Sequence, residues 1–221
     1  MAKKGVLLIL AALALLFAGC GDEKGFIDFT RHAAAPAAPA AERPLVIAFA
    51  PVMSPEETRR PYERMTAYLA EKLGRPVTMV QKRGAAELDR LVAAGEADVA
   101  FLSTGAYTAY RGHEPIELLA MVETKGTILY RTFVIVAADS EIEDFASLKG
   151  HVFAFVDPLS HSGRLAVDYR LLEEGLTPEQ YFGRIFYTHH HDKSIWAVAN
   201  HLADGASIDN QIYEHIEQTN P

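Results

Sequence analysis

The sequence contains a single cysteine, Cys20, among its 221 residues. One thiol cannot close a disulfide within the chain, and it cannot supply a cysteine-based metal site. We therefore expect neither a disulfide framework nor a thiolate metal centre.

Basic residues are also scarce, because 21 lysines and arginines stand against 29 aspartates and glutamates, for a net charge of −8. A nucleic-acid partner would require a basic surface, so we expect none. An acidic protein can still bind a small anion, since helix ends and hydroxyls act locally while distant charges are screened.

The N-terminal apolar run, residues 5–18, is too short to span a bilayer comfortably. It follows Lys3 and Lys4 and leads through small residues to Cys20, as in an export signal. The tract LFAGC at residues 16–20 resembles a bacterial lipoprotein cleavage box, although Phe17 is atypical there. We expect residues 1–19 to be a lipoprotein signal peptide and Cys20 to carry a lipid anchor.

Alanine and proline dominate the next segment, so we expect residues 20–44 to be the lipidated cysteine and a tether. The remainder alternates strand-like and helical patterns. A continuous apolar run at residues 45–50 predicts a central parallel strand, and Ser54 and Pro55 predict the start of a helix. This alternation predicts an α/β fold. A long strand-like run at residues 128–138 can cross between two lobes, which we assign to residues 45–138 and 139–221.

The segment DPLSHSG at residues 157–163 stands between an apolar strand pattern and a helical pattern. A helix N-terminus presents free N–H groups, and here Ser160, His161 and Ser162 flank it. This combination predicts an oxyanion cradle. The alternative is that Ser160 or Ser162 only caps the helix.

Other predicted strand ends carry similar polar groups, namely Thr104 and Tyr107 after the third strand, His191, and Asp209. In open α/β sheets, ligands bind at the carboxyl ends of strands. His189, His190 and His191 invite a zinc interpretation, but consecutive residues of an extended segment point to alternate sides. We expect His189 and His190 in a solvent-facing loop, and His191, before a capping Asp192, facing a cleft.

Neither a serine on a strained nucleophile elbow nor a carboxylate pair at working spacing is evident, so we do not expect an enzyme. A metal-dependent hydrolase using His189, His190, His191 and Asp192 is the enzymatic alternative.

From about residue 45 onward, the chain resembles the extracytoplasmic substrate-binding proteins of phosphonate, phosphite and phosphate ABC transporters. The resemblance rests on ordered blocks: APVMSPEET at residues 50–58, GEADVAF at 95–101, TGAY at 104–107, DPLSHSG at 157–163, HDKSI at 191–195 and ID at 208–209. It implies a periplasmic-binding-protein fold of type II, with two Rossmann-like lobes. It also implies a ligand site made of Ser160, His161, Ser162, His191, Thr104, Tyr107 and Asp209.

The chain departs from the family pattern in three respects. His161 stands where the family commonly has Thr or Asn, and Asn210 stands where a serine is common. The return crossover, which would complete the first lobe, is not evident, so we expect a C-terminal truncation.

The resemblance implies capture of a phosphorus oxyanion for uptake by a membrane permease, with a monomeric binding protein and no cofactor. The protein would lie outside the cytoplasm, anchored through Cys20. An alternative of another class is a sensory protein that presents the ligand to a receptor kinase.

Overall fold

The computed structural model describes residues 43–112 and 115–219. The predicted signal peptide, the lipidation site Cys20 and nearly all of the predicted tether lie outside the described residues. Within the part of the chain that is described, no helix is both long and apolar enough to cross a membrane.

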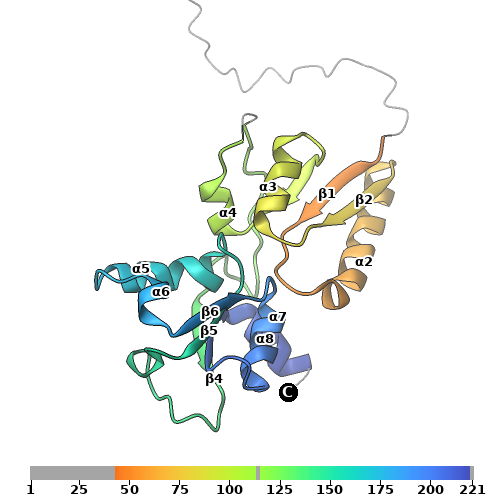
Figure 1. The fold of residues 1–221 in the computed structure, drawn as a ribbon. Coiled ribbons are helices and arrows are strands. Elements are labelled where there is room, and N and C mark those ends of the chain that lie inside the picture. The colour runs from red at the N-terminus through yellow and green to blue at the C-terminus, as the bar shows by residue number, and fades with distance from the viewer. Residues whose placement is uncertain (1–42, 113–114, 220–221) are drawn as a thin grey trace, which may run out of the picture. The chain divides into compact units, whose positions relative to one another are not determined.

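The first sheet has three parallel strands in the order β2-β1-β3. Its strands are β1 (Leu45–Phe49), β2 (Val77–Gln81) and β3 (Val99–Phe101), and its helices are α2 (Pro55–Leu73), α3 (Ala85–Ala93) and α4 (Thr104–Ala109). The prediction that the first apolar run forms a central strand is confirmed, as Figure 1 shows.

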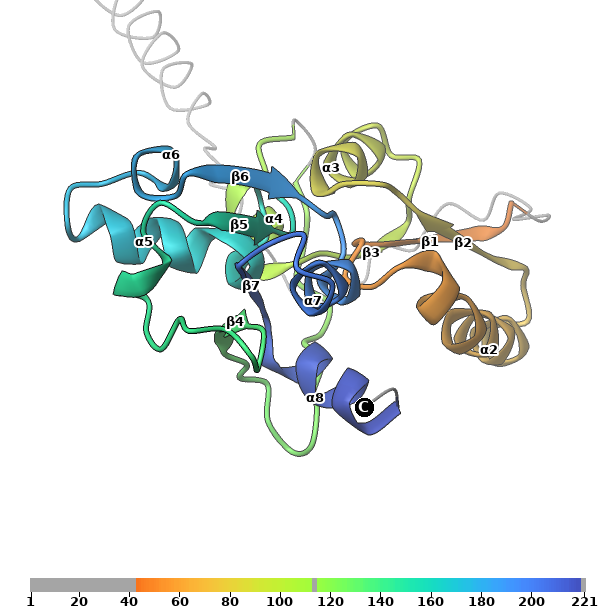
Figure 2. The same cartoon turned by 60° about the horizontal axis from the view of Figure 1, so that its bottom comes forward.

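Successive residues of β1 point to opposite faces, and each face is covered by a helix. Ala48 packs with Leu88 and Leu91 of α3. Phe49, only 1% exposed, stacks on Tyr62 of α2 with ring centroids 3.9 Å apart. Figure 2 shows α2 and α3 on opposite sides of this sheet.

The second sheet has four strands in the order β4-β7-β5-β6. They are β4 (Thr132–Val136), β5 (Val152–Phe155), β6 (Arg184–Tyr187) and β7 (Gly205–Asp209), and β4 alone runs antiparallel to its neighbour. The sequence-based division assigned residues up to 138 to the first lobe, whereas β4 belongs to the second sheet. The reason is a five-residue ladder with β7, from Thr132 opposite Asp209 to Val136 opposite Gly205.

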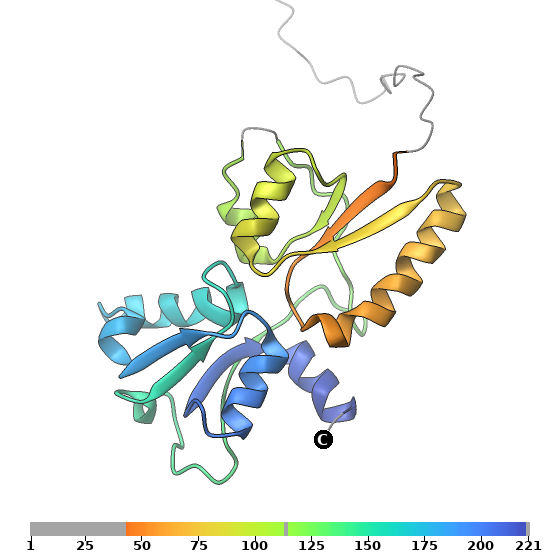
Figure 3. The ribbon, with the colours of Figure 1, turned by 45° about the vertical axis from the view of Figure 1, so that its right-hand side comes forward.

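Helical segments cover both faces of the second sheet. They are the 3-10 turn η1 (Ala146–Leu148), the π-helical turn η2 (His161–Leu165) continuing into α5 (Ala166–Leu172), α6 (Pro178–Tyr181), α7 (His191–Ala199) and α8 (Asn210–Thr219). Phe153 and Phe155 of β5 pack with Val167 and Leu171 of α5, and Ala154 packs with α7 on the other face. Figure 3 shows the sheet between the cyan α5 and the blue α7.

Residues 115–131 form no strand, and of the strand-like run at residues 128–138 only Thr132–Val136 forms one, β4. They contain a single isolated bridge between Thr124 and Thr127. Leu119 is 83% exposed. A strand needs a hydrogen-bonded neighbouring strand, and in residues 43–112 and 115–219 neither sheet includes this segment. It is hydrogen-bonded to the C-terminal end of β7 only at Arg131, whose carbonyl accepts the Asn210 N–H at 3.0 Å.

We expect Phe153→Ala to lower the free energy of unfolding by about 3–5 kcal/mol, because it opens a cavity at a fully buried position. Phe153 stacks on Phe182 at 4.2 Å, so that contact is also lost. Val134→Ala, at a position 40% exposed in the same sheet, is the control and should cost below about 1 kcal/mol. Urea unfolding followed by circular dichroism measures both, and equal losses would contradict this description of the core.

Candidate functional site

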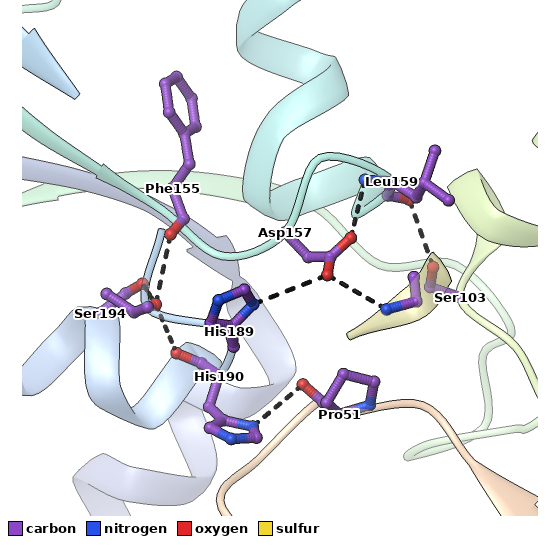
Figure 4. A network of polar contacts seen from close by, with 10 residues as sticks. Pro51, Ser103, Phe155, Asp157, Leu159, His189, His190 and Ser194 are labelled. Atoms are coloured by element: carbon purple, nitrogen blue, oxygen red, sulfur yellow. Dashed lines mark hydrogen bonds and ion pairs between the residues drawn. The ribbon is translucent and has the colours of Figure 1, made fainter. Parts of the chain in front are cut away.

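The loop after β5 is fixed by the carboxylate of Asp157, which is 6% exposed. One carboxylate oxygen accepts a hydrogen bond from the Leu159 N–H at 2.9 Å, within the loop. The other accepts from the N–H of Ala85, the first residue of α3, at 3.2 Å. Figure 4 shows that Asp157 joins the two segments. The loop of the second sheet is therefore attached to a helix of the first.

Ser160 occupies the N-cap of the helix that begins at His161, and its Oγ accepts the Gly163 N–H at 3.0 Å. The Gly163 carbonyl oxygen in turn accepts a hydrogen bond from the Val156 N–H at 3.0 Å. A Cβ on Gly163 would lie 2.5 Å from that of Val156, so only glycine allows this approach. The capping alternative for Ser160 is thus what the structure shows, and it leaves the hydroxyl proton free to be donated elsewhere.

Ser162 is only 3% exposed, and no side-chain hydrogen bond joins it to another of the described residues. His161 is exposed, and its ring meets Tyr130 edge to face with centroids 5.9 Å apart. Tyr130 therefore lies at the N-terminal end of this helix.

Thr104, the first residue of α4, faces the same group of side chains. Its Oγ1 accepts a hydrogen bond from the Tyr130 hydroxyl at 2.9 Å. Ser103 Oγ caps α4 by accepting from the Ala106 N–H at 3.2 Å, and it donates to the Leu159 carbonyl at 3.4 Å. Thr104 and the residue 160–162 turn are thus held together through Ser103 and Tyr130.

Tyr107 lies on α4 and is 41% exposed. No hydrogen bond or ring contact joins it to the other predicted site residues in the described ranges. Tyr107 is therefore not joined by such a contact to the other predicted site residues.

Tyr130 was missed by the sequence analysis, although it contacts both Thr104 and His161. Burial raises the pKa of its hydroxyl, and the negative charge of Asp209 raises that pKa further. The only sequence signal was a tyrosine inside a long apolar run, which does not distinguish a core residue from a site residue.

His191 and Asp209 also lie together. His191 is 4% exposed, and its Nδ1 accepts the Asp209 backbone N–H at 3.1 Å. Burial lowers the pKa of His191 to about 4, so the ring is neutral near pH 7 and its proton lies on Nε2. Nε2 has no partner among the described residues.

Asp209 precedes α8, and its carboxylate accepts the Gln211 N–H at 2.7 Å. Burial raises the pKa of this carboxyl, and hydrogen bonds from the Gln211 and Ile212 backbone oppose that change. Asp209 is therefore both a helix cap and a neighbour of His191.

The three consecutive histidines contact three different partners. His190 Nδ1 lies 3.3 Å from the Pro51 carbonyl, and His189 Nδ1 lies 3.9 Å from the Asp157 carboxylate (Figure 4). Both lie in the predicted loop between β6 and α7, and the His189 side chain is 41% exposed. The prediction that both face solvent is wrong for His190, which is partly buried against Pro51. In the described ranges, no group of histidine and acidic side chains is arranged to hold a metal ion.

The prediction that Asp192 caps α7 is also wrong. The helix begins at His191 with His190 as its N-cap. Asp192 instead accepts the Ser54 N–H at 3.0 Å, and the His191 N–H donates to the Val52 carbonyl at 3.0 Å. The start of α7 is thus hydrogen-bonded to the loop that follows β1, because that loop presents free backbone groups to it.

Arg164, the cation nearest to Ser162 in sequence, is occupied elsewhere. Its guanidinium pairs with Asp168 at 2.7 Å and Glu179 at 3.1 Å. It also lies over the Phe155 ring, 4.4 Å from the centroid. Arg164 therefore joins η2 to α5 and α6 through Nε and Nη2, while its buried Nη1 has no hydrogen-bond partner among the described residues.

A cavity of about 480 Å³ adjoins these residues and shares only Tyr130 with them. It is lined by Thr127, Leu129, Tyr130, Arg131, Phe133, Asn210 and Glu214.

Residues 47–221 match the model of a family described as the periplasmic substrate-binding protein of phosphonate ABC transporters. This match covers most of the chain and includes every predicted ligand-binding residue.

Solved structures with the same fold come from several bacteria. A binding-protein component of a phosphonate ABC transporter from Pseudomonas aeruginosa aligns with a TM-score of 0.73 and 22% identity, over 81% of this chain and 62% of its own. PhnD1 from Prochlorococcus marinus, in complex with methylphosphonate, aligns with a TM-score of 0.71 and 17% identity, over 80% of this chain and 67% of its own. The alkanesulfonate-binding protein SsuA from Xanthomonas axonopodis pv. citri, bound to MOPS, aligns with a TM-score of 0.51 and 17% identity, over 81% of this chain and 59% of its own.

These likenesses confirm the predicted type II periplasmic-binding-protein fold. The chain spans 62% of the length of the Pseudomonas protein.

The buried neutral state of His191 predicts a pH-dependent stability. Its pKa is about 4 in the folded protein and about 6.5 when unfolded, so protons favour the unfolded state. The stabilisation is complete above about pH 6.5 and is lost as the pH falls toward 4, by about 3 kcal/mol.

We expect His191→Asn to lack this part of the acid sensitivity, since an amide oxygen can accept the Asp209 N–H without titrating. Urea unfolding of both proteins between about pH 4.5 and pH 7.5 measures the difference. Parallel stability curves for the two proteins would show that His191 does not titrate in this way.

Proposed function

Because the chain belongs to the family of periplasmic substrate-binding proteins of phosphonate ABC transporters, we propose that it captures a phosphorus oxyanion for uptake. The ligand would be a phosphonate, phosphite or phosphate, delivered to a membrane permease. The family consists of binding proteins that act outside the cytoplasm, and no catalytic step is proposed.

The observation that carries the proposal is the helix start at Ser160. The Ser160 oxygen is already an acceptor for the Gly163 N–H, so its own proton can go to a ligand oxygen. Ser162 offers a second hydroxyl, which no side-chain hydrogen bond joins to another of the described residues. Helix N–H groups and two hydroxyls suit a tetrahedral oxyanion.

Three further residues support the same ligand. Thr104 accepts from Tyr130, which leaves the threonine proton for a ligand. His191 presents an unpaired Nε2–H, and Asp209 fixes the ring through its backbone N–H. By the family resemblance, His161 and Tyr107 complete the set, and Tyr130 is our addition to it.

Closure around the ligand is the event that a permease would detect. The loops that follow β1 and β2 bond to the start of α7 and to Asp157, through Val52, Ser54 and Ala85. These bonds would form and break as the two sheets approach and separate.

We further propose that residues 1–19 direct export and that Cys20 carries the lipid anchor, on the sequence pattern alone. The protein would act as a monomer tethered to a bacterial membrane. Presentation of the same ligand to a receptor kinase is the second candidate, because it would use the same residues.

We expect Ser162→Ala to weaken phosphonate binding by about tenfold to a hundredfold, since it removes a hydrogen bond to a charged group. Its stability should hardly change, because no hydrogen bond joins the hydroxyl to another described residue. Ser160→Ala should weaken binding similarly but also cost about 1 kcal/mol of stability, since it removes the cap of Gly163.

Isothermal titration calorimetry with methylphosphonate, phosphite and phosphate gives the affinities, and thermal melts give the stabilities. Ser147→Ala, which loses only its side-chain bond to Asp144 in the 3-10 turn before β5, is the matched control and should bind normally. If the parent binds none of these anions, or if Ser162→Ala binds as well as the parent, the proposal fails.

A further inference from the structure

We propose that the hydrogen bond from Tyr130 to Thr104 is a latch between the two sheets, which α8 positions and a bound anion strengthens. The latch can be tested without a ligand, whereas its strengthening by an anion rests on the proposed function. Tyr130 acts here as a positioning residue, through Thr104.

Tyr130 lies in a segment that is held on α8. The Arg131 N–H donates to Asn210 Oδ1 at 2.6 Å, and the Arg131 carbonyl accepts the Asn210 N–H at 3.0 Å. Gln211 Nε2 donates to the Leu129 carbonyl at 3.4 Å. The residues on both sides of Tyr130 are therefore bonded to the first turn of α8.

A tight turn adds a further attachment to α8. Thr124 and Thr127 exchange two backbone hydrogen bonds, of 2.9 Å and 3.1 Å. Lys125 and Gly126, between them, have φ values of 52° and 79°, and positive φ at both central residues is typical of a type I′ turn. Nζ of Lys125, at the tip of this turn, pairs with Glu214 of α8 at 2.7 Å.

These bonds fix residues 124–131, the clamped segment, to the second sheet, because α8 continues directly from β7 and β4 begins directly after the segment. In residues 115–123, by contrast, no hydrogen bond or ion pair joins the chain to another described residue. A change in the distance between α4 and the clamped segment can therefore be absorbed in residues 115–123.

Tyr130 reaches from the clamped segment to the first sheet. Its hydroxyl donates to Oγ1 of Thr104, the first residue of α4, at 2.9 Å, while its ring lies edge to face against His161 of η2. Burial raises the pKa of the Tyr130 hydroxyl, so the hydroxyl stays protonated at neutral pH and can donate. This hydrogen bond therefore joins a residue fixed to the second sheet with a helix of the first.

The same bond determines what Thr104 can offer a ligand. Because Oγ1 accepts from Tyr130, the threonine proton is available to an anion. An anion that accepts this proton polarises the hydroxyl, which makes Oγ1 a better acceptor for Tyr130. Binding of the anion would then strengthen the latch without any change in the clamped segment.

Amide hydrogen exchange, followed residue by residue by NMR on the full chain without ligand, tests the latch. The reporters are backbone N–H groups that donate from one sheet's elements to the other's, namely those of Ser54, Ala85 and His191. Loss of one hydrogen bond should raise the population of the open form about fivefold, so the reporters should exchange about fivefold faster in Tyr130→Phe.

Two further variants separate the latch from the clamped segment. Tyr169→Phe makes the same change at a position of α5 that is 66% exposed, and it should leave the reporters at the parent rate. Asn210→Ala removes the acceptor of the Arg131 N–H, so it should also accelerate the reporters. Because the clamped segment acts through Tyr130, the double variant should exchange no faster than Tyr130→Phe alone.

Calorimetry with methylphosphonate tests the effect of the anion on the latch. We expect the affinity to fall about fivefold in Tyr130→Phe, because the anion then no longer gains from a strengthened hydrogen bond. The affinity of Tyr169→Phe should equal that of the parent.

The outcomes separate the latch from the proposed function. If the reporters keep the parent rate in Tyr130→Phe, or if only the amides of β1 and β5 exchange faster, the latch is overturned. Faster reporters with an unchanged affinity would overturn the strengthening by the anion. If the parent does not bind methylphosphonate, phosphite or phosphate, the proposed function and this strengthening are both wrong, and the exchange rates still decide the latch.

Discussion

The carboxylate of Asp157 is the constraint on which the candidate site depends. It accepts the N–H of Leu159 within its own loop and the N–H of Ala85 at the start of α3. The first bond shapes the turn that places Ser160 at the helix cap, and the second attaches this turn to the other sheet. Because the same carboxylate makes both bonds, the position of the serines and the approach of the two sheets are coupled.

Small residues make this coupling possible. A Cβ at Gly105 would lie 2.1 Å from the Leu159 carbonyl oxygen, and one at Gly163 would lie 2.5 Å from the Val156 Cβ. The two glycines therefore let α4 and the helix after Ser160 approach the same loop from opposite sides. Both approaches involve backbone or Cβ atoms that cannot move aside easily, so glycine is required at each position.

The sequence predicted the strands that are buried on both faces and the helices with clear starts. The runs that became β1 and β5 are continuously apolar, and Pro55 after Ser54 marks the start of α2. The two-lobe division was less accurate, since β4 pairs with β7, which lies some 70 residues later in the chain. The sequence pattern of one strand does not show which distant strand it will pair with.

The same limit explains the site. Ser160, His161 and Ser162 are adjacent in sequence, so a strand-to-helix pattern was enough to group them. The contact between Tyr130 and Thr104, and the bond between His191 and the Asp209 backbone, join residues from different elements. His190 and Asp192 were misplaced for the same reason, because the loop after β1 supplies their partners, Pro51 and Ser54.

The electrostatic character of the site follows from where its charges are neutralised. Arg164 is only 11% exposed in its side chain, and burying it without partners would be costly. It lies between Asp168, Glu179 and the Phe155 ring, so its charge is already balanced within the second sheet's own helices. A guanidinium paired in this way stabilises the helix and is not free to move toward a ligand.

Uncharged donors suit a protein that must release what it binds. A buried ion pair between an anion and an arginine is strengthened by the low dielectric of a closed site, and its rupture leaves two unpaired charges. The free-energy cost of releasing the ligand is smaller for uncharged donors such as hydroxyls, a neutral imidazole and helix N–H groups. Water can replace the anion as their hydrogen-bond acceptor. Under the proposed function, burial that keeps His191 neutral would therefore serve release as well as capture, since a protonated ring would hold the anion as a counter-ion.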